Sequence, residues 1–132
     1  MVKLSTKYID GHYGADRGQI MAKINSRDKG RRGEVELSKI LNDYGFTTER
    51  MSQYCGKTGV ADVDGLSGIH IECKRVERLV IENAYEQSCR DAKEGEIPVV
   101  MHRKNRGAWM VSMSLEDWVE LYRSWLCQQK DT

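Results

Sequence analysis

Three acidic side chains between Ala61 and Arg75 could hold a divalent metal ion beside the ammonium group of Lys74. The run reads ADVDGLSGIHIECKR and predicts two short strands joined by a turn that contains glycine. Because side chains alternate between the faces of a strand, one face carries charged residues, namely Asp62, Asp64, Glu72 and Lys74. The other face carries small and apolar residues, namely Val63, Ile69, Ile71 and Cys73.

The length of the turn decides whether the acids meet. A two-residue turn would make Asp62 face Cys73 and would leave Asp62 and Glu72 on opposite sides of the sheet. A three-residue turn over 66–68, with Gly68 in the left-handed conformation, makes Asp62 face Glu72. We favour the three-residue turn, because only that register also buries the apolar residues together.

Such a face suits phosphodiester hydrolysis, which needs a water nucleophile and neutralised phosphoryl oxygens. On paired strands the Cβ atoms of Asp62 and Glu72 lie about 5 Å apart, and a hard cation would relieve their repulsion. We predict Mg²⁺, with Mn²⁺ as a substitute, bound also by the carbonyl oxygen of Cys73. Lys74 would orient the water or stabilise the charged phosphorane, and Glu34 would complete the metal site.

A simpler interpretation stays open for each residue. Glu72 and Lys74 would also fit the solvated face of an amphipathic sheet, and Asp64 suits a turn before glycine. Glu34 would also fit a position near a helix start, where an acid suits the helix dipole.

The surrounding pattern predicts the elements that position these residues. A helix is expected over 28–44, ended by Gly45, with Glu34 on its inward stripe. Further strands are expected over 46–51, 97–102 and 108–113, and helices over 81–93 and 115–126. Ser114 should cap the last helix, and we expect its Trp118 and Trp125 in the core, or at an interface, rather than stacked on bases. This order predicts an α/β (α+β) domain with a central mixed five-stranded sheet flanked by helices.

Length and composition fit one domain. The 132 residues suffice for a single core, and no apolar run approaches the roughly 20 residues of a membrane span. We expect residues 1–25, which lack periodicity, to form a flexible or partner-ordered arm before a domain over 26–132. The N-terminus has no apolar signal segment and the four cysteines form no CxxC pair, which favours a cytoplasmic protein with free thiols.

Charge is unevenly distributed although the formal net charge is only +1. Basic clusters beside an acidic site suit a polyanion held through its phosphates. The predicted DNA contacts are Arg27, Lys29, Arg31, Arg32, Lys57, Arg75, Arg103, Lys104 and Arg106. The alternative is that these residues occupy solvated loops and helix ends.

The helical Glu34, the run GVADVDGL and the run IHIECKR together resemble the PD-(D/E)XK nuclease superfamily. The order of elements is similar to that of archaeal-type Holliday junction resolvases and related phage-encoded nucleases. The resemblance implies a restriction-endonuclease-like fold in which Asp62 and Glu72 bind metal, Lys74 is catalytic and Glu34 assists. Gln87 resembles a glutamine that some branches place near the active site. Ala61 stands where the motif has proline, a common departure.

The resemblance also implies a homodimer that places two sites on two strands of a four-way junction. The aromatic residues Trp109 and Trp125 are candidates for the dimer contact. The leading hypothesis is therefore a Mg²⁺-dependent endonuclease for Holliday junctions or other branched DNA, serving recombination or repair in a bacterial nucleoid or a phage-infected cell. A second reading is a phage-type replication and repair nuclease for flaps or duplex DNA. A third is a non-catalytic DNA-binding module that retains the fold.

Overall fold

The computed structural model describes residues 26–51 and 60–131, which form three helices and five strands. The helices are α1 (Ser26–Asp43), α2 (Ile81–Asp91) and α3 (Leu115–Lys130). The strands are β1 (Glu49–Arg50), β2 (Val63–Asp64), β3 (Ile69–Arg75), β4 (Ile97–Arg103) and β5 (Met110–Ser112). The predicted arm over 1–25 and the predicted DNA contact Lys57 lie outside the described residues.

The strands form one mixed sheet in the order β1-β2-β3-β4-β5. Neighbouring strands are antiparallel except β3 and β4, which are parallel and are connected through α2. This arrangement confirms the predicted α+β class and the mixed five-stranded sheet. Within the described part of the chain, no helix combines the length and the apolar character needed to cross a bilayer.

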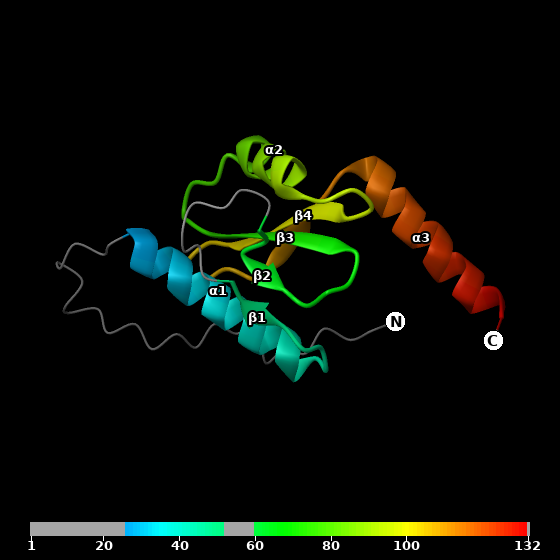
Figure 1. The fold of residues 1–132 in the computed structure, drawn as a ribbon, viewed down its shortest axis with the longest axis horizontal. Coiled ribbons are helices and arrows are strands. Elements are labelled where there is room, and N and C mark those ends of the chain that lie inside the picture. The colour runs from blue at the N-terminus through cyan, green and yellow to red at the C-terminus, as the bar shows by residue number, and fades with distance from the viewer. Residues whose placement is uncertain (1–25, 52–59, 132) are drawn as a thin grey trace.

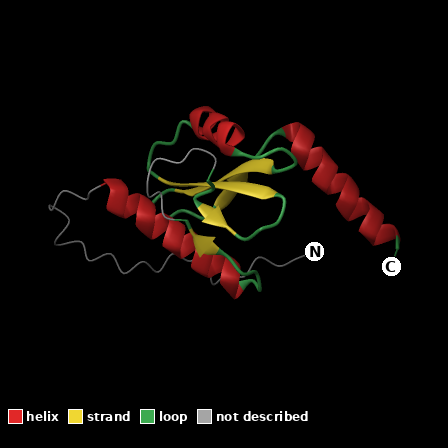
Figure 2. Cartoon of the chain, viewed as in Figure 1, coloured by secondary structure: helices red, strands yellow, loops and turns green. Residues whose placement is uncertain are grey.

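Helices cover both faces of the sheet, as Figures 1 and 2 show, with α1 on one side and α2 on the other. The main core lies under α1, where Leu37 packs with buried residues of three strands, namely Val63, Ile71, Cys73 and Val99. On the α2 side, the hydroxyl group of Ser88 lies 3.0 Å from the carbonyl oxygen of Val99 and 3.4 Å from that of His70. These short contacts hold α2 close to β3 and β4.

The hairpin between β2 and β3 has the predicted register. Val63 pairs with Ile71, which places Asp62 opposite Glu72. Gly68 has φ +81°, and the backbone N–H of Ile69 donates to the carbonyl oxygen of Leu66 at 3.0 Å. The three-residue turn with a left-handed glycine is therefore confirmed.

The first strand is much shorter than predicted. Instead of residues 46–51, only Glu49 and Arg50 pair with β2. The side-chain amide of Asn42 forms hydrogen bonds with both backbone groups of Thr48. It accepts from the N–H of Thr48 at 2.6 Å and donates to its carbonyl oxygen at 3.1 Å. The strand ladder consequently begins only after Thr48.

The last helix begins where expected but packs differently. The hydroxyl oxygen of Ser114 accepts from the N–H of Asp117 at 3.1 Å, which confirms the predicted cap. The helix runs on to Lys130, beyond the predicted end, and extends away from the sheet (Figure 1). Of the two places predicted for Trp118 and Trp125, the core is wrong, because their side chains are 49% and 51% exposed.

Candidate active site

Asp62 and Glu72 meet on the paired strands of the hairpin. Both are buried, with exposed fractions of 3% and 1%, and their carboxyl groups are in hydrogen-bond contact. Oxygen Oδ2 of Asp62 also accepts from the backbone N–H of Cys73 at 2.9 Å. The acids therefore do not form a solvated sheet face, which removes the simpler interpretation of this hairpin.

The pair cannot carry two full negative charges without cost. Burial, followed by the charge of the neighbouring Asp62, raises the pKa of Glu72 to about 7, although Lys74 acts in the opposite direction. A cation bound between the two buried carboxyl groups would relieve this conflict. This is the property expected of a metal site formed by two carboxylates.

Lys74 lies directly beside the acids. Its Nζ atom is 3.2 Å from Oε1 of Glu72 and donates a hydrogen bond to Oε1 of Gln87 at 3.3 Å. Gln87 lies on α2 and so holds the ammonium group from the helix side. An ammonium group has three N–H donors, and these two contacts leave the third able to reach a water or a phosphoryl oxygen.

Glu34 joins the site from α1. It is 8% exposed, and burial, followed by the charge of Asp62, raises its pKa. Arg50 opposes that shift, because its Nε atom donates to Oε2 of Glu34 at 2.6 Å. The structure thus brings Glu34, Asp62, Glu72, Lys74 and Gln87 into one region, as the sequence predicted.

Cys73 can contribute only its backbone oxygen. Its side chain points into the core under α1, and burial, followed by the charge of Asp62, raises the pKa of its thiol. A thiol held in its protonated form is a poor metal ligand. The predicted role of the Cys73 carbonyl oxygen is compatible with this placement.

Most of the predicted DNA contacts lie at the surface. The exposed ones are Arg31, Arg32, Lys104 and Arg106, and the half-buried ones are Lys29 and Arg75. The backbone of Arg27 lies in the first turn of α1, and its side chain lies outside the described part.

Arg103 departs from that group. Its side chain is 0% exposed, and its Nη2 atom lies 2.9 Å from Oε2 of Glu36. Glu36 also accepts from the indole N–H of Trp109 at 3.1 Å and pairs with Arg75 at 3.5 Å. The DNA contact predicted for Arg103 does not fit this placement, because the buried guanidinium group is not accessible to a phosphate. Its ion pair with Glu36 instead joins α1 to the sheet. Trp109 is likewise half-buried rather than an exposed aromatic.

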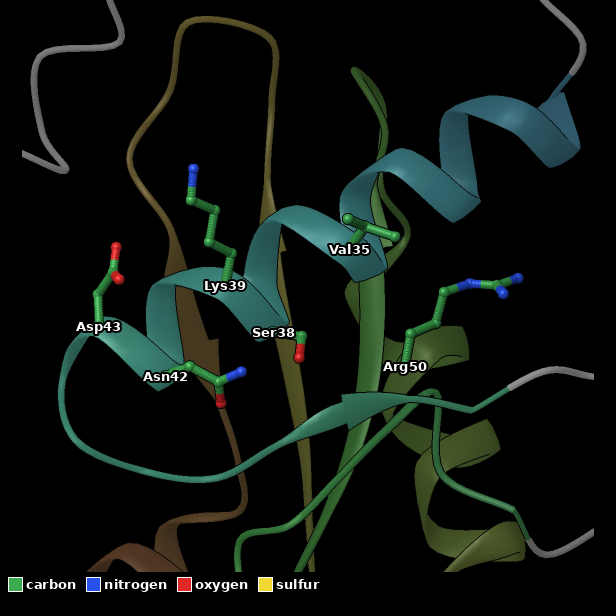
Figure 3. A pocket seen from close by; sticks show the side chains of 6 residues that line it. All are labelled: Val35, Ser38, Lys39, Asn42, Asp43 and Arg50. Atoms are coloured by element: carbon green, nitrogen blue, oxygen red, sulfur yellow. The ribbon is translucent and has the colours of Figure 1, made fainter.

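A shallow pocket is lined by residues of α1 and by one residue of β1 (Figure 3). Its volume is roughly 370 Å³, and it is lined by Val35, Ser38, Lys39, Asn42, Asp43 and Arg50. Ser38 and Asn42 are engaged in hydrogen bonds with Thr48, which are structural. Only Arg50 links this pocket to the acidic site, through its ion pair with Glu34.

Sequence reasoning missed two neighbours of the acids. Arg50 was not identified; it lies on β1, which pairs with β2. His70 was not identified either, and its side chain is 1% exposed. Its position two residues before Glu72 was the available signal, because both side chains point to the same face of β3.

The donor set fits a divalent cation. Carboxylate and carbonyl oxygens are the ligands that Mg²⁺ and Mn²⁺ prefer, and the contact between Asp62 and Glu72 brings two of them together. A family model described as "Phage putative PDDEXK endonuclease" matches residues 25–131, which include every residue of this site. Neither the curated proteins nor the solved structures gave a significant match.

Proposed function

Because the chain belongs to the phage PDDEXK endonuclease family, we propose that it hydrolyses phosphodiester bonds of DNA with the help of a divalent metal ion. The observation that carries this proposal is the buried contact between Asp62 and Glu72, with the ammonium group of Lys74 3.2 Å away. Asp62, Glu72 and the carbonyl oxygen of Cys73 would hold the ion, and Glu34 would assist. We take Mg²⁺ as the ion, with Mn²⁺ as a substitute.

Each protein group has a distinct part. When bound, the cation supplies Lewis-acid stabilisation of the phosphoryl charge and favours ionisation of a water. Lys74 orients that water or neutralises charge on the reacting phosphate, since its ammonium group has a donor to spare. Gln87 positions Lys74 through the hydrogen bond at 3.3 Å. Arg50 favours the ionised form of Glu34 through their ion pair, against the effect of burial.

The test is metal-dependent cleavage by Asp62→Asn and its matched control Asp64→Asn. Asp64 is exposed on β2, two residues after Asp62, and its replacement is the same isosteric change. Asp62→Asn should lower cleavage by at least about a thousandfold, because a ligand that stabilises transition-state charge is lost. DNA binding should stay near that of the wild type or become stronger. Cleavage by Asp62→Asn at the rate of Asp64→Asn would refute the assignment.

We propose branched DNA, such as a four-way junction, as the preferred substrate. Support comes from the resemblance to Holliday junction resolvases and from the prospect of two sites in one dimer. The competing substrate is a flap or duplex end, as in phage replication and repair. Cleavage rates on a synthetic junction, a flap and a linear duplex of shared sequence distinguish the two. A rate on duplex DNA equal to that on the junction would contradict the preference for branches.

The homodimer is proposed to form through α3. Its exposed apolar side chains share one helix and include Leu115, Trp118, Leu121, Tyr122, Trp125 and Leu126. The ring of Tyr122 stacks between Trp118 and Trp125, with centroids 5.2 and 5.8 Å away, so the aromatic stripe is already ordered. A 16-residue helix without packing is marginal in water, and a partner surface would stabilise it.

Charge at the two ends of α3 favours a second copy as the partner. Glu116 and Asp117 lie in the first turn and Lys130 in the last. Antiparallel pairing around a twofold axis would place each acidic end beside the basic end of the other copy.

Light scattering after size exclusion tests this proposal. Trp125→Glu should yield a monomer, because it buries a charge in the apolar contact. The control is Val111→Glu, which changes an exposed apolar residue on the edge strand β5 and should leave the dimer intact. A monomeric wild type, or dissociation caused only by Val111→Glu, would overturn the α3 interface.

A further inference from the structure

A second cluster of possible metal ligands lies nearer the beginning of β3, on the side covered by α2. One ring nitrogen of His70 and one carboxylate oxygen from each of Glu72 and Asp91 all lie within 4.8 Å of one another. His70 and Glu72 are two residues apart on β3, and Asp91 is the last residue of α2. Neither His70 nor Asp91 takes part in the proposed hydrolysis.

The imidazole of His70 supplies an independent sign of a ligand. The residue is 1% exposed, and its Nε2 atom has no hydrogen-bond partner among the described residues. Buried polar atoms normally have a partner, so an unpartnered ring nitrogen beside two carboxylates calls for one. A bound cation would provide it.

The other ring nitrogen fits the same interpretation. Nδ1 of His70 lies 4.0 Å from Oε1 of Glu96. Histidine ligands commonly direct their second ring nitrogen toward a carboxylate, which orients the ring for the metal. Glu96 thus stands where such an orienting carboxylate is expected.

The register of α2 on β3 explains why these residues meet. Gln87 contacts Lys74 near the end of β3, and Asp91 lies one helical turn further, beside His70 near its beginning. Asp91 is half-exposed, whereas His70 and Glu72 are buried, so an ion could enter from the Asp91 side.

We propose that His70, Glu72 and Asp91 form a second metal site that selects a transition-metal ion such as Zn²⁺ over Mg²⁺. An imidazole with two carboxylates is a donor set typical of zinc, with a fourth position left for water. Mg²⁺ prefers oxygen ligands alone and would favour the Asp62 side of Glu72. Glu72 is therefore shared between the two sites.

The binding test titrates the full chain with Zn²⁺ and, for comparison, with Mg²⁺, in the absence of DNA. Nitrogen-15 spectra of the histidine rings and calorimetry measure the binding. The chain has three histidines, so the His70 ring can be assigned with His70→Gln. Zn²⁺ should shift a His70 ring nitrogen, and Mg²⁺ should not. Asp91→Asn should weaken zinc binding by about tenfold or more, while Asp62→Asn should retain it.

The opposite pattern would overturn the site. If Asp62→Asn loses zinc and Asp91→Asn keeps it, zinc binds only where the catalytic ion is proposed. An unshifted His70 ring at millimolar zinc has the same consequence. Asp91→Asn keeps the test decisive even if His70→Gln does not fold, because Asp91 is half-exposed at a helix end. None of these readouts depends on nuclease activity.

A regulatory consequence rests on the proposed function. Zinc at the second site would draw Glu72 away from the catalytic ion and so inhibit cleavage at saturating Mg²⁺. Each variant is compared with its own zinc-free rate. Asp91→Asn should need about tenfold more zinc for half inhibition than the wild type. Equal sensitivity of the two would refute the regulation and leave the binding result standing.

Discussion

Glu72 is the residue on which the site depends most. It contacts Asp62 and Lys74 and contributes to the His70 cluster, although its side chain is almost fully buried. A buried carboxylate beside another carboxylate destabilises the folded state unless a proton or a cation compensates. Function is the reason to retain such a residue, since an amide would fill the same volume without the charge.

Glu72→Gln should therefore stabilise the metal-free protein at pH 8, by on the order of 1–3 kcal/mol. The folded-state pKa of Glu72, about 7, lies above the ordinary value of 4.5, so ionisation destabilises the fold as the pH rises through 7. The advantage of the variant should shrink as the pH falls toward 5, where the wild type binds its proton. Urea unfolding with a chelator present measures this.

Glu86→Gln is the matched control, because Glu86 is exposed on α2. It should change the free energy of unfolding little at either pH. A Glu72→Gln variant that is no more stable than Glu86→Gln at pH 8 would show that the buried acids are not in conflict.

The hairpin is the element that brings the acids together, and two glycines fix its shape. Gly68 has φ +81° with open space around it. Gly65 has φ +131°, and a Cβ atom there would overlap the carbonyl oxygen of Thr47. The chain before β1 thus packs against Gly65 so closely that only glycine fits.

These two glycines should respond differently to alanine. Gly68→Ala should cost about 1 kcal/mol of unfolding free energy, since only the left-handed conformation is penalised. Gly65→Ala should cost more than about 3 kcal/mol, because the backbone of Thr47 must also move. Denaturant titrations of both variants give the comparison, and equal losses would contradict the close approach at Gly65.

The hairpin register could be predicted because a shift of one residue would have moved every side chain of the strand to the other face of the sheet. Periodicity also located α2 and the start of α3 correctly, since caps and apolar spacing are local signals. Local signals could not reveal that α3 extends away from the sheet. The spacing of apolar residues is the same in a helix that packs on a core and in one that packs on a partner. They also could not show that Asn42 displaces the beginning of β1, since that contact bridges a turn.

Across the molecule, the acids of the candidate site and most of the predicted DNA contacts lie at different depths. The acids Glu34, Asp62 and Glu72 are buried, while Arg31, Arg32, Lys104 and Arg106 are exposed. Phosphate contacts release counterions, so affinity for DNA that depends on these residues falls steeply with salt. Counting residues in the sequence could not separate Arg103 from this group, because its burial under α1 depends on the distant Glu36.

DNA binding should thus respond to the removal of surface arginines. The double variant with Arg31→Ala and Arg32→Ala should weaken binding and flatten the salt dependence by about one unit of slope per lost phosphate contact. Arg123→Ala is the control, because that exposed arginine pairs with Glu120 on the outlying α3. Fluorescence anisotropy at several salt concentrations provides the slopes, and equal slopes for both variants would argue against the predicted surface.

The proposed function requires Asp62 and Glu72 to bind one ion next to Lys74. Crystals grown with Mn²⁺, measured at a wavelength where manganese scatters anomalously, test it without reference to activity. We predict a peak within about 2.5 Å of oxygens from both carboxylates and of the Cys73 carbonyl oxygen. A fully occupied crystal in which manganese avoids that position, or touches only one of the two acids, would contradict the account.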